Sequence, residues 1–448
     1  MSLKTPPGPS ASEFLMYFPG LLYDPLTTLN RICEKYGSFV RLGFGNDRVY
    51  LVNDASALKE ILKSDYLRFP RGKTLDDVRF LLGEGLFAAD HEIWSTQRKL
   101  IKPAFHSEAF PLLEKVIRDE LTALREQLDR FAATGESFDF ERMMKRLMFR
   151  ITVRNLFSGD IKADPDEIIE ALDIITGYAS FGSHTMTIIK KTLYSSLGKK
   201  YRTPAKILRA GQVIEDLVNR ILNNVYNYPE QCGTFLNILI NEAQAGRIPR
   251  RQVVDEMKNI IFAGFDTTAE ALTWSFFSIF NHPGILMKTR EEVEGKEPPD
   301  YKNVFRLPYT QNVVKETLRL FPPAWAFHRI TTAESVLSGY TLPVNSWLFI
   351  SPWLIHRSSL FWNNPEEFNP GRFNDEERSQ GIRFEYIPFG NGPHVCIGNG
   401  IANFELLYMI ASLVPEYNFT FADKKPPRLV SGIIIRSSKP VMAQVRKV

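Results

Sequence analysis

Apolar residues recur at helical spacing through most of the middle of the chain. Between Glu92 and Pro283 long stretches are amphipathic, among them LLEKVIRDELTALREQLDRF (112–131) and AGQVIEDLVNRILNNVY (210–226). Residues three and four positions apart share one face of a helix, so this pattern predicts a helical body. Further helices are predicted over TQNVVKETLRL (310–320) and IGNGIANFELLYMIASL (397–413).

Two other regions carry the pattern of strands. FVRLGFGNDRVYLV (39–52) alternates apolar and polar residues on either side of Gly45-Asn46-Asp47, which is typical of a β-hairpin. ESVLSGYTLPVNSWLFISP (334–352) is predicted to form short strands and turns. The expected fold class is therefore mainly α with minor β.

The elements are expected to form two lobes of one domain, residues 1–448. The helical lobe is mainly 92–320 and 398–416, and a small β-rich lobe is mainly 36–70 and 325–352. No Gly/Ser linker, repeat or low-complexity tract separates these regions. The composition agrees, because 44% hydrophobic and 24% charged residues are enough for a large core.

Charge and cysteine content exclude several classes of protein. The net charge is only +4, from 55 basic and 51 acidic residues, so no nucleic-acid partner is expected. Three cysteines far apart argue against a disulfide framework and favour a reducing compartment. The N-terminus has no apolar signal region, and no stretch reaches the roughly 18 apolar residues of a spanning helix. A soluble, cytoplasmic protein is expected.

The segment FGNGPHVCIGNG (389–400) surrounds Cys396 with glycines. Glycine permits close approach of backbone N–H groups to the sulfur, and a predicted helix begins directly after it, so a thiolate would be stabilised. Cys33 and Cys232 are instead expected to be buried structural residues. Zinc is not expected, because His394 and Cys396 supply at most two ligands. A single thiolate ligand is the chemistry of haem iron.

The cysteine segment resembles a known cofactor-binding signature. FGNGPHVCIG matches F-x-x-G-x-[R/H]-x-C-x-G of the cytochrome P-450 superfamily. The resemblance implies that Cys396 is the axial ligand of haem b and that Phe389, Gly392, His394 and Gly398 lie against the haem. It also implies this family's fold, a large helical lobe and a small β-rich lobe around a buried haem.

A glutamate and an arginine three residues apart form the second motif. Glu316 and Arg319 in KETLRLFPP share one face of the predicted helix. By themselves they would be an ordinary surface ion pair. The stretch resembles the E-x-x-R helix of the family, and NPEEFNPGRF supplies Arg372 where a further arginine joins the pair. The resemblance gives all three a structural role.

Basic residues at two other places match the haem-propionate contacts of the family. Trp94 and Arg98 lie one helical turn apart in EIWSTQRKLIKPAF and resemble a W-x-x-x-R helix. Arg329 in FHRI matches a second such arginine. A planar guanidinium suits a carboxylate, because it donates charge-assisted bonds in a fork.

The run DEMKNIIFAGFDTTAEALTWSFFSIF (255–280) is predicted to be one long helix, ended by His282-Pro283. Gly264 weakens it, and a Thr267 hydroxyl can bond the carbonyl of Ala263, which opens a groove. AGFDTT resembles the oxygen-activation motif [A/G]-G-x-[D/E]-T-[T/S]. The resemblance places Ala263 and Gly264 at the haem and makes Asp266 and Thr267 a catalytic acid–alcohol pair that relays protons.

Together the motifs imply a haem-thiolate monooxygenase. It would insert one atom of O2 into a lipophilic molecule, a fatty acid, terpenoid or steroid-like compound, by hydroxylation or epoxidation. Electrons would come from NAD(P)H through a separate redox partner, either ferredoxin with ferredoxin reductase or a diflavin reductase, since no fused reductase is recognisable. A monomer of the microsomal-like branch is expected, a soluble bacterial member or a microsomal protein without its anchor.

The resemblance also implies a substrate pocket, with two groups of residues. Leu82, Phe87, Ile260 and Thr268 form the first, and Ala324, Trp325, Phe327 and Ile433 form the second. Two alternatives to a monooxygenase stay open at this point: a peroxide-using or hydroperoxide-isomerising haem-thiolate enzyme, and a non-catalytic haem-binding sensor. The acid–alcohol pair favours the monooxygenase over both.

Overall fold

The computed structural model describes residues 4–43, 48–72, 76–89, 91–157, 164–178, 203–227, 233–294, 299–374 and 384–448. The helices before the middle of the chain are α1 Ala11–Tyr23, α2 Pro25–Tyr36, α3 Ala55–Lys59, α4 Asp76–Leu82, α5 His91–Ile101, α6 Phe110–Thr134, α7 Phe140–Leu156, α8 Pro165–Tyr178 and α10 Ala205–Asn227. Those that follow are α11 Thr234–Gln244, α12 Arg250–Gly264, α13 Asp266–Asn281, α14 Pro283–Val293, α15 Pro308–Leu320, α16 Pro352–Ile355 and α18 Asn399–Leu413.

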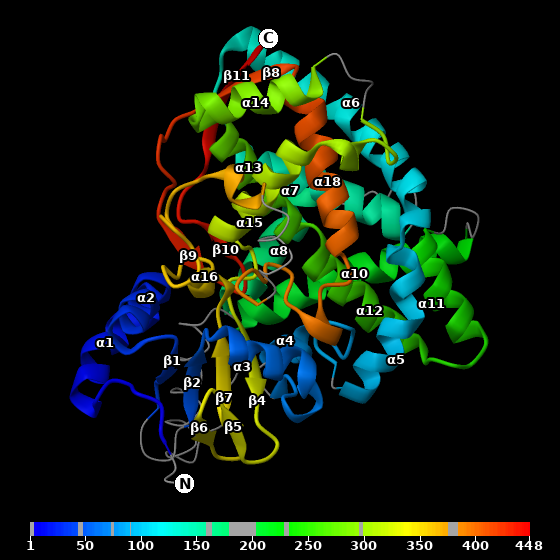
Figure 1. Ribbon diagram of the computed structural model, residues 1–448. Helices are drawn as coiled ribbons and strands as arrows, with labels where there is room; N and C mark the ends of the chain where they lie inside the picture. Colours follow the sequence, from blue (N-terminus) through cyan, green and yellow to red (C-terminus); the bar gives the residue numbers. More distant parts are fainter. Residues whose placement is uncertain are drawn as a thin grey trace.

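In the described part of the chain the strands are short and form four small sheets. They are β1 Phe39–Arg41, β2 Val49–Val52, β3 Phe138–Asp139, β4 Phe327–Ile330, β5 Ser335–Leu337, β6 Tyr340–Leu342, β7 Trp347–Ile350, β8 Tyr417–Phe421, β9 Leu429–Ser431, β10 Ile435–Ser437 and β11 Met442–Lys447. The prediction of a mainly α fold with minor β is confirmed. Figure 1 shows most of the helices above a small β-rich part that contains β1, β2 and β4 to β7, with α1 and α2 beside that part.

The predicted hairpin is present. β1 pairs antiparallel with β2, with Phe39 opposite Val52, while the expected turn residues Gly45 to Asp47 lie outside the described part of the chain. β2 then pairs in parallel with β7, and β7 pairs antiparallel with β4, which gives the order β1-β2-β7-β4. A sheet of order β3-β11-β8 was not predicted from the sequence. It joins residues 138–139 to the C-terminal strand, a pairing that no local pattern reveals.

The amphipathic pattern of the longest helix is satisfied by burial on one side. In α6, Leu113, Ile117, Leu121, Leu124 and Leu128 are buried at spacings of three and four. The helix ends at Gly135, whose φ of +72° is left-handed and which caps the last turn through its N–H. Among the described residues no helix is long and apolar enough to cross a membrane.

The prediction of a single helix over residues 255–280 is wrong in one respect. The structure has two helices, α12 and α13, which meet at Phe265. The Thr267 hydroxyl donates to the carbonyl oxygen of Ala263 at 3.0 Å, which is the bond expected from the sequence, and Gly264 gives that turn little intrinsic helical stability. α13 ends before His282 and Pro283, as predicted.

Candidate active site

The loop that carries Cys396 approaches its neighbours so closely that only glycine fits. Gly390 and Gly392 have φ of +72° and +69°, and a Cβ on Gly392 would lie 1.8 Å from the carbonyl oxygen of Leu62. The backbone N–H of Cys396 donates to the carbonyl of Phe389 at 2.9 Å, which closes the loop. These contacts hold the cysteine in one position at the start of α18.

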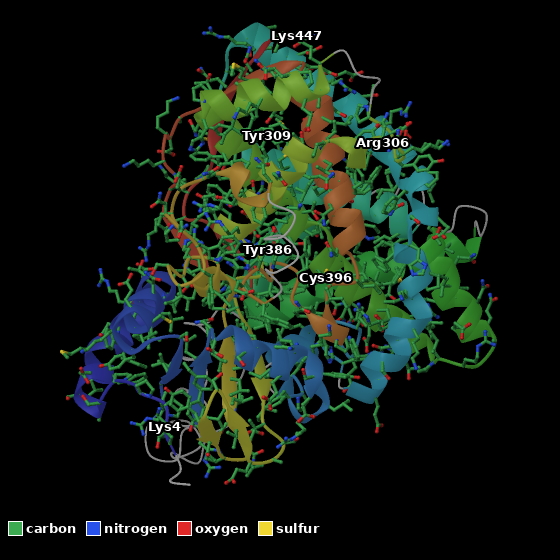
Figure 2. The ribbon with its side chains drawn as sticks, viewed as in Figure 1. Lys4, Arg306, Tyr309, Tyr386, Cys396 and Lys447 are labelled. Carbon is green, nitrogen blue, oxygen red and sulfur yellow. The ribbon has the colours of Figure 1, made fainter. Side chains whose placement is uncertain are left out.

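The thiol of Cys396 is held by polar groups inside the protein. Burial raises its pKa, while the N–H groups of Gly398 and Asn399 and the charge of Arg98 act in the opposite direction. The Cys396 sulfur lies deep enough in the protein for burial to raise its pKa, yet its side chain is not covered by neighbouring atoms. The two observations agree when the sulfur faces an internal space, and Figure 2 draws Cys396 well inside the outline of the molecule.

A second set of residues borders such a space at the junction of α12 and α13. From Val253 to Ile279 every residue is buried except Ala263, Gly264 and Thr267. These three lie on one side of the helix pair, at the break. Since α18 begins three residues after Cys396 and packs against α13, the break and the thiol belong to neighbouring elements.

Positive charge gathers beside the thiol. The rings of Trp94 and His394 lie 3.8 Å apart between centroids, and the Arg98 guanidinium lies 5.6 Å from the Trp94 ring. Arg71 lies with Nη2 at 3.3 Å from Nδ1 of His394. Arg71 was not predicted, because a single arginine between Pro70 and Gly72 belongs to no motif.

Burial disfavours the charged forms of Arg71, Arg98 and Arg329, and repulsion between these arginines adds to the effect. Burial lowers the pKa of Arg329 to about 9, with Arg71 adding repulsion, and lowers that of Arg71 to about 10, with Arg98 adding repulsion. Among the described residues no carboxylate forms an ion pair with Arg98 or Arg329. A buried cationic cluster is stable when an anion accompanies it.

These features fit haem b. The Cys396 thiolate would supply a ligand to the iron, Arg98 and Arg329 would pair with the carboxylates of the group, and Ala263, Gly264 and Thr267 are the residues of the helix pair that packing leaves partly uncovered. The chain offers no competing cluster of metal-binding side chains in the part that the structure describes.

The Glu316 motif forms a buried network rather than a surface ion pair. Glu316 and Arg319 are both fully buried, with Nε to Oε2 at 2.7 Å and Nη2 to Oε1 at 2.9 Å. Arg372 adds Nε to Oε1 at 3.0 Å. His356, which was not predicted, joins the network to the cysteine loop. Its Nδ1 lies 3.2 Å from the Arg319 carbonyl, and its Nε2 accepts from the Ile387 N–H at 2.8 Å.

His356 must be neutral for this arrangement. Burial lowers the pKa of His356 well below 6.5, and the charges of Arg319 and Arg357 add to the effect. The ring therefore presents one unprotonated nitrogen to the Ile387 amide, two residues before Phe389.

The two members of the predicted acid–alcohol pair have different partners. Thr267 of α13 bonds the Ala263 carbonyl of α12 across the break, whereas Asp266 is buried and forms an ion pair with Arg436, with Lys145 Nζ at 3.5 Å. Lys145 also lies 3.4 Å from Glu270, which is fully buried. Burial raises the pKa of Glu270 well above its ordinary value. Lys145, Glu270 and Arg436 were not predicted, because they come from three distant segments.

The first group of predicted pocket residues is only partly brought together. Phe87 is half-buried, and its ring centroid lies 5.5 Å from that of Phe262. Leu82 and Ile260 are buried, and the Leu82 carbonyl accepts from Asn259, the residue before Ile260. Thr268 turns away from this group. Its hydroxyl contacts the carbonyl of Gly264 at 3.5 Å and the Glu405 side chain of α18.

In the second group, a hydrogen bond joins Trp325 to the segment of Ile433. The Trp325 indole N–H donates to the carbonyl of Gly432 at 2.8 Å, which fixes the segment that contains Ile433. Ala324 is exposed, while Phe327 and Ile433 are half-buried, and the Arg329 guanidinium lies 5.1 Å from the Phe327 ring. Arg329 thus belongs to the cationic cluster and also contacts this group.

Comparison with known proteins identifies the family. The family model for cytochrome P-450 matches residues 6–445. LUTEIN DEFICIENT 5, a chloroplastic protein of Arabidopsis thaliana, is 29% identical over 92% of this chain and 72% of its own length. Cyclooctatin synthase of Streptomyces melanosporofaciens is 30% identical over 85% and 83%, and cyclooctat-9-en-7-ol 5-monooxygenase of that organism is 27% identical over 91% and 88%. The chain belongs to the cytochrome P-450 family and is a monooxygenase.

Proposed function

We propose that this enzyme holds haem b through the Cys396 thiolate and oxidises a hydrocarbon-rich, terpenoid-like molecule with electrons from a separate protein. The observation that carries the haem assignment is an accessible thiol, held inside the protein, beside Arg98 and Arg329, neither of which forms an ion pair with a carboxylate in the part of the chain that the structure describes. Arg98 and Arg329, with Arg71 and His394, would bind the two propionates. Trp94, Phe389, Gly392 and Gly398 shape the surface against which the haem lies.

When bound, haem supplies the activation of O2 that allows one oxygen atom to enter a C–H or double bond. The chain positions the substrate and controls protons. Thr267 borders the space at the helix break and can hold a water through its hydroxyl oxygen, because its proton is already donated to Ala263. Asp266 contacts Arg436, which also pairs with the partly exposed Asp173, so the charge of the buried Asp266 is compensated by a cation that reaches toward solvent.

The apolar pocket residues support a lipophilic substrate. Phe87, Ile260, Ala263, Phe327 and Ile433 offer hydrocarbon surface, and few polar groups lie among them. Two relatives are named for such molecules, cyclooctat-9-en-7-ol 5-monooxygenase and carotene epsilon-monooxygenase of Arabidopsis thaliana. Their chemistry favours a ring or polyene hydrocarbon over a fatty acid for this chain.

The first experiment is the absorption spectrum of the reduced protein with carbon monoxide. A far red-shifted Soret band is expected for wild type and for Cys33→Ser, and it should be lost in Cys396→Ser. Cys33 is the matched control, because it is a half-buried cysteine whose pKa burial raises to about 12. An unchanged band in Cys396→Ser would remove this residue as the ligand.

The substrate class and the electron source are tested with the same preparation. A panel of carotenes, cyclic terpenes, steroids and fatty acids is added to the oxidised protein, and a shift from low to high spin identifies the compounds that bind. Turnover of the best compound is then compared with NADPH and each kind of redox partner, and with peroxide alone. Turnover with peroxide only would contradict the proposed electron source.

A further inference from the structure

Residues 83–89, which follow α4, have no regular secondary structure, yet side chains bond the backbone N–H groups of four of them, while Gly83, Ala88 and Ala89 also donate to backbone carbonyls. We call this segment loop 83–89. The N–H of Glu84 donates to Asp255 at 3.1 Å, and that of Leu86 donates to Glu256 at 3.0 Å. The N–H groups of Phe87 and Ala88 donate to Oδ1 of Asn259 at 3.1 and 3.2 Å. A single face of α12 therefore replaces the pairing that a strand would supply.

Asn259 is the member of this face that uses its full bonding capacity. Besides accepting two N–H groups, it donates through Nδ2 to the carbonyls of Leu82 at 3.0 Å and Asp255 at 2.7 Å. It is 1% exposed. A helix-surface asparagine would need none of these bonds, and no other neutral side chain of this size has two donors and an acceptor with two lone pairs.

Two glycines make the close approach to α12 possible. A Cβ on Gly83, whose φ is +75°, would lie 2.0 Å from Oδ1 of Asp255. A Cβ on Gly85 would lie 2.5 Å from Nδ2 of Asn259. The two glycines and the two polar residues of α12 therefore depend on one another sterically.

Side chains from outside α12 hold the opposite edge of the loop. Arg71 donates to the carbonyls of Leu86 at 3.1 Å and Phe87 at 2.7 Å, and Arg79 donates to that of Ala88 at 2.8 Å. Because Arg71 also contacts His394, the loop is tied to the segment that carries the cysteine. Loop 83–89 is thus held by hydrogen bonds to α12 on one side and to Arg71 and Arg79 on the other.

The side chain that loop 83–89 presents is Phe87. Its ring contacts Phe262 at 5.5 Å, and its amide is held by Asn259, one turn before Ala263 of the helix break. We propose that Asn259 is a positioning residue that fixes Phe87 at the distal pocket and thereby sets which compounds the pocket accepts. This inference rests on the proposed haem site, because the pocket is defined by it.

The test uses two iron ligands, imidazole and 4-phenylimidazole, bound to the oxidised haem-loaded protein and followed by the Soret shift. Imidazole senses the iron alone, whereas the phenyl group must also fit beside Phe87. In Asn259→Leu we expect the preference for 4-phenylimidazole over imidazole to fall about tenfold, with imidazole affinity and the carbon monoxide spectrum unchanged. Asn259→Asp keeps the acceptor and should lie between Asn259→Leu and wild type.

Two further variants separate this role from a general loss of stability. Thr273→Val is the control, because Thr273 is also fully buried and bonds only its own helix, to the Ala269 carbonyl at 2.8 Å; its preference should equal that of wild type. In Gly85→Ala the added Cβ would collide with Asn259 and displace the loop, so this variant should show the same loss of preference as Asn259→Leu. It therefore tests the inference even where Asn259→Leu does not fold.

Amide hydrogen exchange of the peptide that spans the loop gives an independent readout. Exchange at Glu84, Leu86 and Phe87 should be at least about tenfold faster in Asn259→Leu and Gly85→Ala than in Thr273→Val. Haem-loaded variants with wild-type preference and wild-type exchange would overturn the inference. Absence of haem from wild type itself would instead overturn the proposed function.

Discussion

Glu405 in α18 provides a prediction of stability against pH. Its side chain is 3% exposed and contacts the Thr268 hydroxyl of α13. Burial raises the pKa of Glu405 from 4.5 to about 8, and the bond from Thr268 opposes only part of that rise. Replacement by glutamine keeps the size and a hydrogen-bonding group but removes the titration.

The raised pKa of Glu405 determines how the unfolding free energy changes with pH. The folded protein holds the Glu405 proton more tightly than the unfolded chain does, so this contribution to stability is complete below pH 4.5 and is lost as the pH rises through about 8. Each pH unit in this window is worth about 1.4 kcal/mol. Between pH 5 and pH 8.5, Glu405→Gln should therefore gain about 4 kcal/mol of unfolding free energy relative to wild type.

Guanidinium unfolding of haem-loaded protein, followed by circular dichroism from pH 5 to pH 8.5, measures this difference. Burial also raises the pKa of Glu256, to about 7, and that of Glu270, but both residues titrate in both proteins and cancel in the comparison. Glu136→Gln, at an exposed position, should show no trend. A difference between Glu405→Gln and wild type that is constant or falls with pH would refute the reasoning.

Three further substitutions test the site. Glu316→Gln should lower the unfolding free energy by about 3–5 kcal/mol, because it leaves buried Arg319 uncompensated, whereas Asp65→Asn at the exposed ion pair with Arg68 should change it by less than about 1 kcal/mol; chemical unfolding measures both. Arg329→Met should speed haem loss to apomyoglobin, and an unchanged rate would exclude a propionate contact. Thr267→Ala should divert electrons to peroxide and reduce product per NADPH consumed, and unchanged coupling would contradict its role.

The parts of the site that could be predicted are those encoded in short runs of sequence. The glycine pattern around Cys396 requires left-handed backbone, and the Thr267 bond to Ala263 spans a single helical turn. Glu316 and Arg319 lie on one turn as well. The structure contains each of these contacts, but local geometry alone predicted a surface ion pair for Glu316 and Arg319, and only the resemblance implied their buried structural role.

The parts that could not be predicted depend on contacts between distant segments. Arg436 reaches Asp266 across 170 residues, and His356 reaches Ile387 across 31. The break at Phe265 was expected as a groove but not as the end of a helix, because propensity alone cannot tell a bend from an interruption. Thr268 was assigned to the pocket from its place in a motif, whereas its side chain faces α18.

The helix pair α12–α13 explains why one stretch of sequence carries so many polar residues in a buried setting. Since successive residues on a helix point about 100° apart, neighbouring positions serve different partners. Asn259 holds loop 83–89, Thr267 borders the haem space, Asp266 faces α7 and β10, and Thr268 faces α18. Burial of these groups is tolerated because each one has its own partner. Loop 83–89, the Thr267 hydroxyl and α18 are therefore all held by this helix pair, and a shift of the pair would disturb all three at once.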